Sequence, residues 1–333
     1  MRDPAFWWQP AGTASALLAP LANCYGAIAS GRLRKAGRSV GVPVICVGNP
    51  TVGGAGKTPT ALAVARLLIA SGKRPIFLTR GYGGELAGPV LVDKVIHSAV
   101  DVGDEPLLLA RVAPTIVAHD RVAGAEAARA AGADVIVMDD GFQNASLAKD
   151  LSLLVVDGSR GLGNGKVLPA GPLRAPLGAQ LDRAQALLVI GEISGAEAVI
   201  SAAISRGLPV FHGRLEPDLK ALTALRPHKV FAFAGIGDPE KFFATLKEAR
   251  VDVRICDAFP DHHRYRGAEI LALLVRAERE GLVLVTTEKD LMRLAGERDA
   301  LALLEVLRVL PVTLAVREAD AFGKLVLSAA GLT

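Results

Sequence analysis

The 333-residue sequence has few of the residues that stabilise small cross-linked proteins. Its three cysteines, Cys24, Cys46 and Cys256, are far apart and form no CxxC pair, which excludes a disulfide framework and a zinc site built on paired cysteines. Hydrophobic residues make up 51% of the chain and charged residues 22%, so a disordered or fibrous protein is also excluded. The length predicts one large or two medium-sized folded domains.

Acidic residues are missing from the N-terminal quarter of the chain. No Asp or Glu lies between Asp3 and Glu85, an interval that contains nine Lys and Arg residues, and the rest of the chain is net acidic. This asymmetry predicts an anionic partner on the N-terminal side, either a lipid surface or phosphate groups. It argues against general nucleic-acid binding by the whole chain.

Charge of either sign is absent from residues 4–31, which include Trp7 and Trp8 and lead directly into a basic cluster beginning at Arg32. Prolines and polar residues dilute the apolar character that a membrane-spanning helix needs. The basic residues follow the apolar stretch, whereas a secretory signal begins with them. We therefore predict that residues 1–38 form a helix in the interface of an anionic membrane. The alternative is an N-terminal helix folded onto the protein's own core.

Beyond residue 38, short apolar runs alternate with longer helical patterns, which is typical of βαβ units and a mainly parallel sheet. The predicted strands cover residues 42–47, 75–79, 115–118, 135–138, 151–156, 187–190, 230–234, 253–256, 282–286 and 312–316. Residues 212–228 are polar and contain proline, and mark the best domain boundary. We predict a core α/β domain over 39–220 with helices on both faces of its sheet, and a smaller α/β domain over 221–333.

A glycine-rich segment, GNPTVGGAGKTP over 48–59, lies directly between a predicted strand and a predicted helix. Its glycines allow successive backbone N–H groups to point into one concavity, and the helix N-terminus adds a positive dipole end. The residues expected to hold nucleotide phosphates are Gly53, Gly54, Ala55, Gly56, Lys57 and Thr58. The Lys57 ammonium can reach the β- and γ-phosphates and the Thr58 hydroxyl can hold Mg²⁺. The strict GxxxxGK[ST] motif has glycine where this chain has Thr51, but the strand–loop–helix context predicts a P-loop NTPase-like core.

Two carboxylates, Asp139 and Asp140, follow the predicted strand over 135–138. In a P-loop fold such residues lie at the carboxyl edge of the sheet, opposite the phosphate loop, where they can position Mg²⁺. Adjacent strand residues point to opposite faces. We therefore expect one of the two carboxylates to be directed at the metal and the other to order its surroundings.

The base-reading motif [NT]KxD of GTPases is missing, because Thr287–Asp290 (TEKD) differs from it in register. Its absence favours an adenine nucleotide.

Two further segments supply candidate acid–base groups. Asp104 and Glu105 open a predicted helix, and His262 and His263 follow Asp261 in the second domain. A carboxylate oriented by an imidazole can receive the proton of an attacking hydroxyl. The alternative is that the acids only cap a helix and the histidines lie on the surface.

Taken in order, these segments resemble the tetraacyldisaccharide 4′-kinase family of lipid A biosynthesis over nearly the whole chain. The matching segments are VGNPTVGGAGKTP (47–59), RGYGG (80–84), VGDEP (102–106), DDGFQN (139–144), LPAGPLR (168–174), FAGIGDPEKF (233–242), FPDHHRY (259–265) and TTEKD (286–290). The resemblance implies transfer of the γ-phosphate of ATP, with Mg²⁺, to the 4′-hydroxyl of an acylated glucosamine disaccharide 1-phosphate. It also implies a location at the cytoplasmic face of the inner membrane, peripheral or monotopic, and we expect a monomer.

The resemblance also implies roles for individual residues. Asp104 and His262 would form the dyad that accepts the 4′-hydroxyl proton, so the two domains must approach each other. Gln143, with the two aspartates before it, would line the metal and nucleotide side, and Arg174 would contact a substrate phosphate. The family often has an acid after the PLR sequence, whereas this chain has Ala175, so no metal role is expected there.

Two other functions fit part of the same pattern. A P-loop ATPase or small-molecule ligase would turn over ATP without a glycolipid acceptor. A membrane-attached nucleotide switch would do no chemistry, and would have no need of Asp104 and His262.

Overall fold

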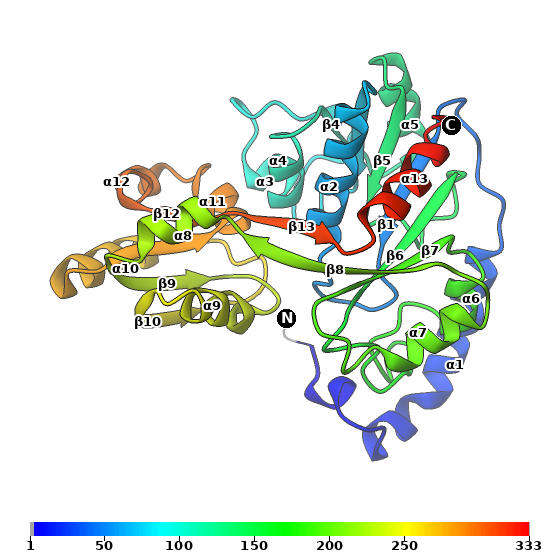
Figure 1. The fold of residues 1–333 in the computed structure, drawn as a ribbon, viewed down its shortest axis with the longest axis horizontal. Coiled ribbons are helices and arrows are strands. Elements are labelled where there is room, and N and C mark those ends of the chain that lie inside the picture. The colour runs from blue at the N-terminus through cyan, green and yellow to red at the C-terminus, as the bar shows by residue number, and fades with distance from the viewer. Residues whose placement is uncertain (1–2, 333) are drawn as a thin grey trace.

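The computed structural model describes residues 3–332, which form two lobes joined by two extended strands (Figure 1). The larger lobe contains a nine-stranded sheet in the order β13-β8-β7-β6-β1-β5-β2-β4-β3. Its strands are β1 (Val44–Gly48), β2 (Pro75–Thr79), β3 (Val90–Leu91), β4 (Thr115–Val117), β5 (Val135–Asp139), β6 (Leu151–Asp157), β7 (Ala186–Ile190), β8 (Val210–Pro217) and β13 (Val312–Val316). Strands β4, β2, β5, β1, β6, β7 and β8 pair in parallel, which agrees with the predicted fold class.

Helices cover both faces of this sheet. One face packs against α1 (Thr13–Leu33), α5 (Arg121–Ala130), α6 (Leu177–Leu181) and α7 (Glu197–Ile204). The other face packs against α2 (Lys57–Ala70), α4 (Asp104–Leu109) and α13 (Ala319–Ala329). Because both faces are covered, the central strands are continuous apolar runs with every residue of β1, β2, β5 and β7 buried. The short helix α3 (Ala99–Val102) directly precedes α4.

The smaller lobe has a four-stranded parallel sheet in the order β10-β9-β11-β12. Its strands are β9 (Lys229–Ala234), β10 (Asp252–Ala258), β11 (Val283–Thr287) and β12 (Arg308–Leu310), and its helices are α8 (Leu219–Leu225), α9 (Pro239–Glu248), α10 (Gly267–Glu280), α11 (Glu288–Leu294) and α12 (Leu301–Val306). Two hydrophobic clusters, one on each side of this sheet, form its core.

The predicted second domain over 221–333 is wrong at its C-terminal end. Strand β13 returns to the larger lobe and pairs antiparallel with β8, and α13 then packs against α2. Strand β8 is long enough to pair with β7 through its first half and with β13 through its second half. The chain therefore passes between the lobes twice, and the return strand has an ordinary apolar pattern that composition cannot distinguish from a strand of the smaller lobe.

The N-terminal helix α1 has one face against the protein and one face in solvent. Ser15, Ala22, Gly26 and Leu33 are buried, and small side chains here let the helix lie close to the loop before α6. The opposite face exposes large apolar side chains, namely Leu17 (82% exposed), Leu21 (63%), Tyr25 (41%) and Ile28 (58%). The buried face agrees with the alternative of a helix folded onto the protein's own core, whereas insertion of the exposed face into a membrane remains a prediction. None of the helices within residues 3–332 is long and apolar enough to cross a membrane.

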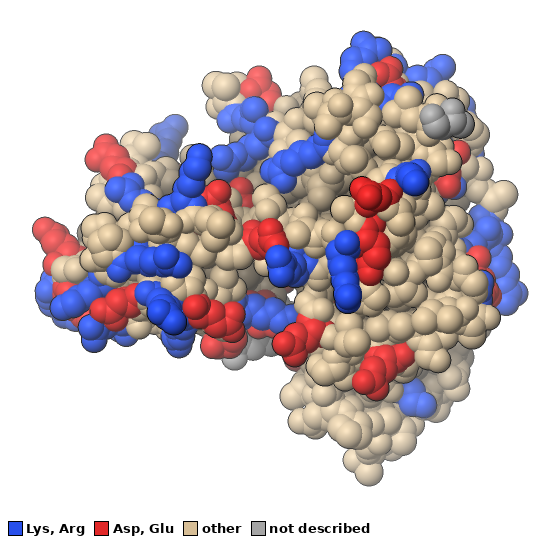
Figure 2. Space-filling model, in the orientation of Figure 1, with Lys and Arg blue, Asp and Glu red and all other residues tan. Residues whose placement is uncertain are grey.

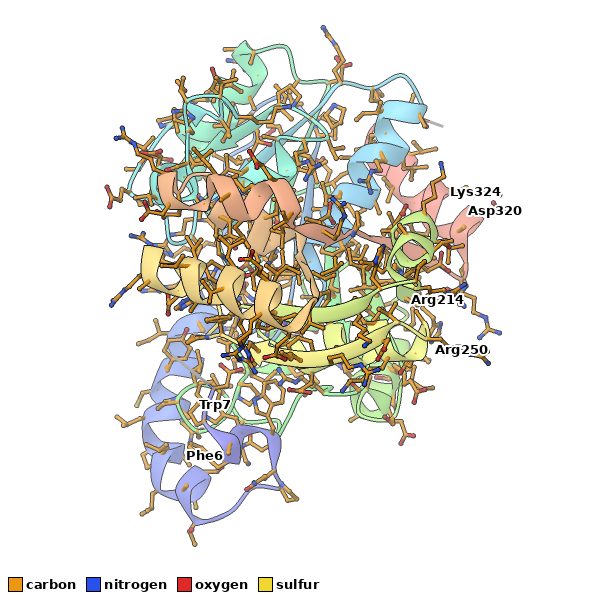
Figure 3. All side chains as sticks on the ribbon, turned by 90° about the vertical axis from the view of Figure 1, so that its left-hand side faces the viewer. Phe6, Trp7, Arg214, Arg250, Asp320 and Lys324 are labelled. Atoms are coloured by element: carbon orange, nitrogen blue, oxygen red, sulfur yellow. The ribbon has the colours of Figure 1, made fainter. Side chains whose placement is uncertain are left out.

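The segment before α1 contains a short 3₁₀ helix, Ala5–Trp8, at the same end of the molecule (Figure 3). The Trp7 indole N–H donates to the Pro169 carbonyl at 3.0 Å, and the Asn164 backbone N–H donates to the Trp7 carbonyl at 2.7 Å. The N-terminal aromatic residues are therefore tied to the 161–176 loop. This end of the molecule carries few charged side chains compared with the smaller lobe (Figure 2).

Candidate active site

The glycine-rich loop connects β1 to α2 at the carboxyl edge of the large sheet. Gly53 and Gly56 have φ angles of 92° and 85°, values that side-chain-bearing residues rarely adopt. At Gly56 a Cβ would also lie 2.6 Å from Ile190 Cδ1. Among the described residues no side chain caps the α2 N-terminus, so the N–H groups of its first turn are available to an anion.

Lys57 begins α2 and its ammonium points back along the loop. Nζ lies 3.4 Å from the Gly53 carbonyl oxygen and 3.8 Å from an Asp140 carboxylate oxygen. Burial lowers the pKa of Lys57, and Arg174 lowers it further, while Asp140 opposes both effects. A triphosphate bound here would supply the negative charge that a buried ammonium needs.

Asp139 ends β5 and faces α2. Its Oδ2 lies 3.2 Å from the Thr58 hydroxyl, which donates to it, whereas its buried Oδ1 has no hydrogen-bond partner among residues 3–332. Burial, followed by the nearby charges of Glu105 and Asp140, raises the pKa of Asp139 to about 7. A buried carboxylate oxygen without a partner beside a hydroxyl fits the few protein ligands that Mg²⁺ uses when phosphates and waters complete its shell.

Asp140 follows the end of β5 and is held by cations. Arg174 Nη1 and Nη2 donate to its two oxygens at 3.0 and 3.2 Å, and Arg174 Nε donates to the Thr51 carbonyl at 2.9 Å. Although burial opposes them, Lys57 and Arg174 hold the pKa of Asp140 below its usual range. The two adjacent carboxylates thus face different surroundings, but strand alternation is not the cause, because β5 ends at Asp139 and Asp140 adopts a φ of 52° in the turn that follows. Arg174 in this structure braces the phosphate loop and its aspartate.

Gln143 supports the loop from the same side. Its Nε2 donates to the Asn49 carbonyl at 3.0 Å and to Gln180 Oε1 at 3.2 Å. Gln180 in turn donates to the Pro50 carbonyl at 3.1 Å. These amides hold the backbone that leads into the glycine-rich loop.

Asp104 and His262 meet between the two lobes, although 158 positions separate them in the sequence. Asp104 opens α4 and is 3% exposed, and its Oδ1 lies 3.2 Å from His262 Nδ1. His262 adopts a φ of 55°, and the edge of its ring packs on Tyr82 with ring centroids 5.1 Å apart. The neighbouring His263 instead pairs with Glu269 at 3.1 Å and stacks on Phe259. Of the two histidines, His262 therefore reaches Asp104, whereas His263 pairs within its own lobe.

Two cations from α11 complete the contact between the lobes. Arg293 Nε donates to Asp104 Oδ2 at 2.8 Å, and Lys289 Nζ donates to Glu105 Oε1 at 2.6 Å. Burial would raise the pKa of Asp104, but hydrogen bonding to His262 and the charges of Arg293 and Lys289 hold it well below its usual range. The charge of Asp104 also raises the pKa of His262 above its ordinary value, against the effect of burial.

Comparison with known proteins gives the same assignment along the whole chain. Residues 14–330 match the family described as tetraacyldisaccharide-1-P 4′-kinase. A tetraacyldisaccharide 4′-kinase of Rhodopseudomonas palustris (strain BisA53) is 55% identical over 331 residues, covering 99% of this chain and 96% of the relative. The chain belongs to the tetraacyldisaccharide-1-phosphate 4′-kinase family.

Two further kinases of this family are similar to the chain to different degrees. A tetraacyldisaccharide 4′-kinase of Methylobacterium sp. (strain 4-46) is 56% identical over 322 residues, covering 96% of this chain and 95% of the relative. The solved structure of "apo" form LpxK from Aquifex aeolicus in complex with ATP has a TM-score of 0.74 and 28% identity, covering 95% of this chain and 99% of that one. The family resemblance predicted from the ordered motifs is therefore confirmed.

The sequence reasoning missed the part that α11 plays in this kinase family member. The TEKD segment matched the family pattern and lacked the guanine motif, but no role was assigned to its residues. In the structure Lys289 reaches Glu105, and Asp290 accepts from the Gly235 N–H at 3.1 Å and the Tyr265 hydroxyl at 2.9 Å. The available signal was the spacing of Lys289 and Arg293, which are four residues apart and so lie on the same face of a helix. The role of these two cations depends on the acidic residues that they contact, and those acidic residues lie in the other lobe.

Replacing Arg293 with Met should strongly destabilise the protein. Arg293 is 6% exposed and also contacts Asp290 at 2.8 Å, so its loss leaves two buried carboxylates without their cation. We expect the free energy of unfolding in urea to fall by about 3–5 kcal/mol. Arg254→Met, which breaks an exposed ion pair with Asp252, serves as the control and should change it by less than about 1 kcal/mol. Equal effects of the two substitutions would contradict this prediction.

Proposed function

We propose that this protein transfers the γ-phosphoryl group of ATP to the 4′-hydroxyl of a tetraacyl disaccharide 1-phosphate, the reaction for which its family is named. The observation that carries the proposal is the Asp104–His262 pair, 3.2 Å apart, formed by two lobes at the edge that also holds Lys57, Thr58 and Asp139. A nucleotide switch has no use for such a pair. The ATP bound by the solved relative supports the choice of nucleotide.

In this mechanism the phosphate loop and Lys57 hold the β- and γ-phosphates, and the N–H groups at the start of α2 add positive charge. Thr58 and Asp139 would hold Mg²⁺, which when bound neutralises phosphate charge as the β–γ bridging bond breaks. The ionised Asp140, braced by Arg174, keeps Lys57 oriented towards the phosphates. Phosphoryl transfer depends mainly on such positioning and charge stabilisation.

The dyad removes the proton of the attacking hydroxyl. The 4′-oxygen forms its bond to the γ-phosphorus, ADP leaves, and the hydroxyl proton passes to the dyad. Both oxygens of Asp104 are already occupied, one by His262 and one by Arg293. Because His262 Nδ1 faces Asp104, the other ring nitrogen, Nε2, is left to accept the proton; it lies 3.9 Å from an Asp261 oxygen. The Asp104 carboxylate stabilises the imidazolium that forms.

The smaller lobe contributes His262, so movement of this lobe about β8 and β13 would open and close the dyad. In this structure the lobes are in contact elsewhere as well: Arg264 Nη2 donates to the Gly83 carbonyl at 3.0 Å, and Arg160 lies 3.7 Å from Asp238. Closure of this kind would exclude water from the reacting phosphate. The predicted hinge motion remains a prediction.

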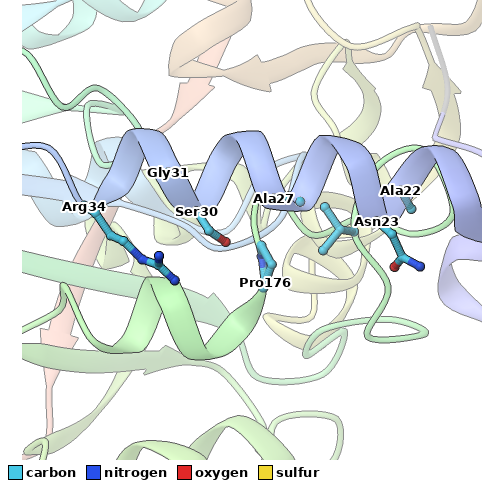
Figure 4. Close-up of a pocket in the computed structure, with 9 residues that line it drawn as sticks. Ala22, Asn23, Ala27, Ser30, Gly31, Arg34 and Pro176 are labelled. Atoms are coloured by element: carbon cyan, nitrogen blue, oxygen red, sulfur yellow. The ribbon is translucent and has the colours of Figure 1, made fainter.

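A lipid acceptor held in a membrane surface explains why the N-terminal segment combines an exposed apolar face with basic residues. The exposed apolar face of α1 can enter the interface of an anionic membrane at the cytoplasmic face of the inner membrane, with Arg32, Arg34 and Lys35 against the headgroups. A groove of about 350 Å³ runs along α1 beside Val167 and Pro176, and Arg34 lies at one end of it (Figure 4). Pro176, which lines this groove, follows the loop-bracing Arg174 by two residues.

Labelled ATP tests the proposed reaction directly. Incubation with a tetraacyl disaccharide 1-phosphate should yield ADP and a product labelled at the 4′ position, and ADP release should depend on the acceptor. Release that is the same with and without the acceptor would favour a P-loop ATPase. Nucleotide binding with no release in either case would favour a switch.

Membrane binding should depend on the exposed face of α1. Replacing Leu17, Leu21 and Ile28 together with Glu should release most of the protein from anionic vesicles, because it removes apolar contacts and adds charge to the inserted face. Leu219, Leu271 and Leu301 are 74%, 61% and 69% exposed on the smaller lobe and provide a matched triple control. Equal vesicle binding by the two triple variants in a flotation assay would rule out the interface helix.

A further inference from the structure

A lysine of the smaller lobe reaches into the active site of the larger lobe and has no role in the mechanism above. Lys289 lies in the first turn of α11, and its Nζ donates to Glu105 Oε1 at 2.6 Å. An ammonium group has three N–H donors, and among residues 3–332 this glutamate is the one hydrogen-bond acceptor that Nζ contacts. Two donors of a largely buried cation are therefore available to a ligand.

Glu105 connects this lysine to the start of the phosphate-loop helix α2. The same glutamate oxygen accepts a hydrogen bond from the Thr58 hydroxyl at 3.4 Å, so a single carboxylate oxygen lies between that hydroxyl and the Lys289 ammonium. Burial would raise the pKa of Glu105, but the charge of Lys289 lowers it, and so does the charge of Lys57. Both lysines are thus close to one carboxylate at the edge where the terminal phosphates are expected.

The first turn of α11 is firmly held, which fixes the place from which Lys289 extends. The Thr287 hydroxyl oxygen accepts from the Asp290 N–H at 3.2 Å, and the buried Asp290 side chain is tied to Gly235 and Arg293. Helix α11 also packs against α4 of the larger lobe (Figure 1). A cation on such a rigid element loses little conformational freedom when it binds an anion.

We propose that Lys289 binds the γ-phosphate of ATP, as a cation that the smaller lobe supplies when the lobes close, an inference that rests on the proposed function. Lys57 would contact the terminal phosphates from the loop, and Lys289 would contact γ-phosphate oxygens from the opposite lobe, with Glu105 as its positioning residue. The transferring group spreads its charge over its equatorial oxygens, so a second cation there stabilises the transition state. Because His262 lies in the same lobe, closure would bring the proton acceptor and this charge to the phosphate together.

Nucleotide binding tests this role without the lipid acceptor. The dissociation constants of ADP and of β,γ-methylene ATP, each with Mg²⁺, are compared between the wild type and Lys289→Met. We expect the Kd of the ATP analogue to rise about 10- to 100-fold, as for a lost charge-assisted hydrogen bond, and the Kd of ADP to change by less than about threefold. In the transfer assay kcat should fall by about 10²- to 10³-fold, with the KM for the acceptor near its wild-type value.

Lys241→Met is the matched control. Lys241 also crosses between the lobes, because it lies on α9 and its Nζ donates to Asp157, the last residue of β6. Its loss removes an ion pair between the lobes but no predicted γ-phosphate contact, so the ratio of the two dissociation constants should stay at the wild-type value. An equal change of that ratio in both variants would assign Lys289 to the contact between the lobes and overturn the inference.

Other outcomes also overturn the inference. An equal rise of both dissociation constants would assign Lys289 to structure, and an unchanged Kd of the ATP analogue would remove it from γ-phosphate binding. If Lys289→Met does not fold because Glu105 is left unpaired, the double variant Glu105→Gln/Lys289→Met is compared with Glu105→Gln by the same ratio. Wild-type protein that binds the ATP analogue but transfers nothing to the acceptor overturns the proposed function. Normal wild-type transfer without the Lys289 effect on the ratio overturns the inference only.

Discussion

Replacing Asp104 with Ala should lower kcat by about 10³-fold while leaving the affinity for ATP near the wild-type value. The carboxylate contacts His262 and Arg293 and, within the described part of the chain, makes no hydrogen bond to the glycine-rich loop, so its loss removes the group that stabilises protonated His262 and spares nucleotide binding. Single-turnover transfer to the lipid acceptor measures the first quantity, and equilibrium binding of an ATP analogue measures the second.

Control variants separate the dyad from general damage. His262→Ala should cause a similar loss, and the double variant should be little worse than either single variant because the two side chains act as a unit. His263→Ala, which alters the histidine paired with Glu269, should retain most activity once its folding is verified. Near-normal rates for Asp104→Ala would remove this residue from the mechanism.

The pH dependence of kcat, compared between the wild type and a variant of Asp104, identifies the atom that accepts the proton. Asp104 raises the pKa of His262, and a base must be deprotonated, so the wild-type kcat should fall as the pH drops through that raised pKa. Asp104→Asn removes the negative charge and should move this acid limb to lower pH at reduced kcat. If kcat of Asp104→Asn no longer falls at low pH, the proton acceptor is the Asp104 carboxylate and not His262.

Replacing Lys57 with Ala should reduce transfer by about 10³-fold or more and also weaken ATP binding. Lys57 is the cation at the start of α2 nearest the loop carbonyls, and no other side chain of the described chain donates to the Gly53 carbonyl from that helix. Its charge matters most when the phosphates acquire charge in the transition state, so kcat should fall more than affinity.

Lys220→Ala, an exposed lysine on α8, is the control for Lys57→Ala and should leave both quantities unchanged. Lys57→Arg keeps the charge but changes the shape of the donor, and should recover binding better than turnover. Substantial acceptor-dependent ADP production by Lys57→Ala would contradict the assignment of this loop to the phosphates.

Local sequence determined the features whose physical cause is local. The glycine-rich loop could be predicted because a positive φ at Gly53 and Gly56 requires glycine, and because the loop lies between a buried strand and a helix. Strand alternation predicted different surroundings for Asp139 and Asp140, but β5 ends at Asp139 and the φ of 52° at Asp140 places that side chain by a turn instead. Most of the buried parallel strands were found because strands covered on both faces are continuous apolar runs.

Only the tertiary structure decided which distant groups meet. The return of β13 to the large sheet and the pairing of Lys289 with Glu105 and of Arg293 with Asp104 all join residues from separate segments. Electrostatic attraction and hydrogen bonding depend on distances of a few ångströms in space and not on the separation of two residues along the sequence. The sequence therefore determined the phosphate loop and the parallel core, whereas the packing of the two lobes decided which acid meets the imidazole and which cations surround it.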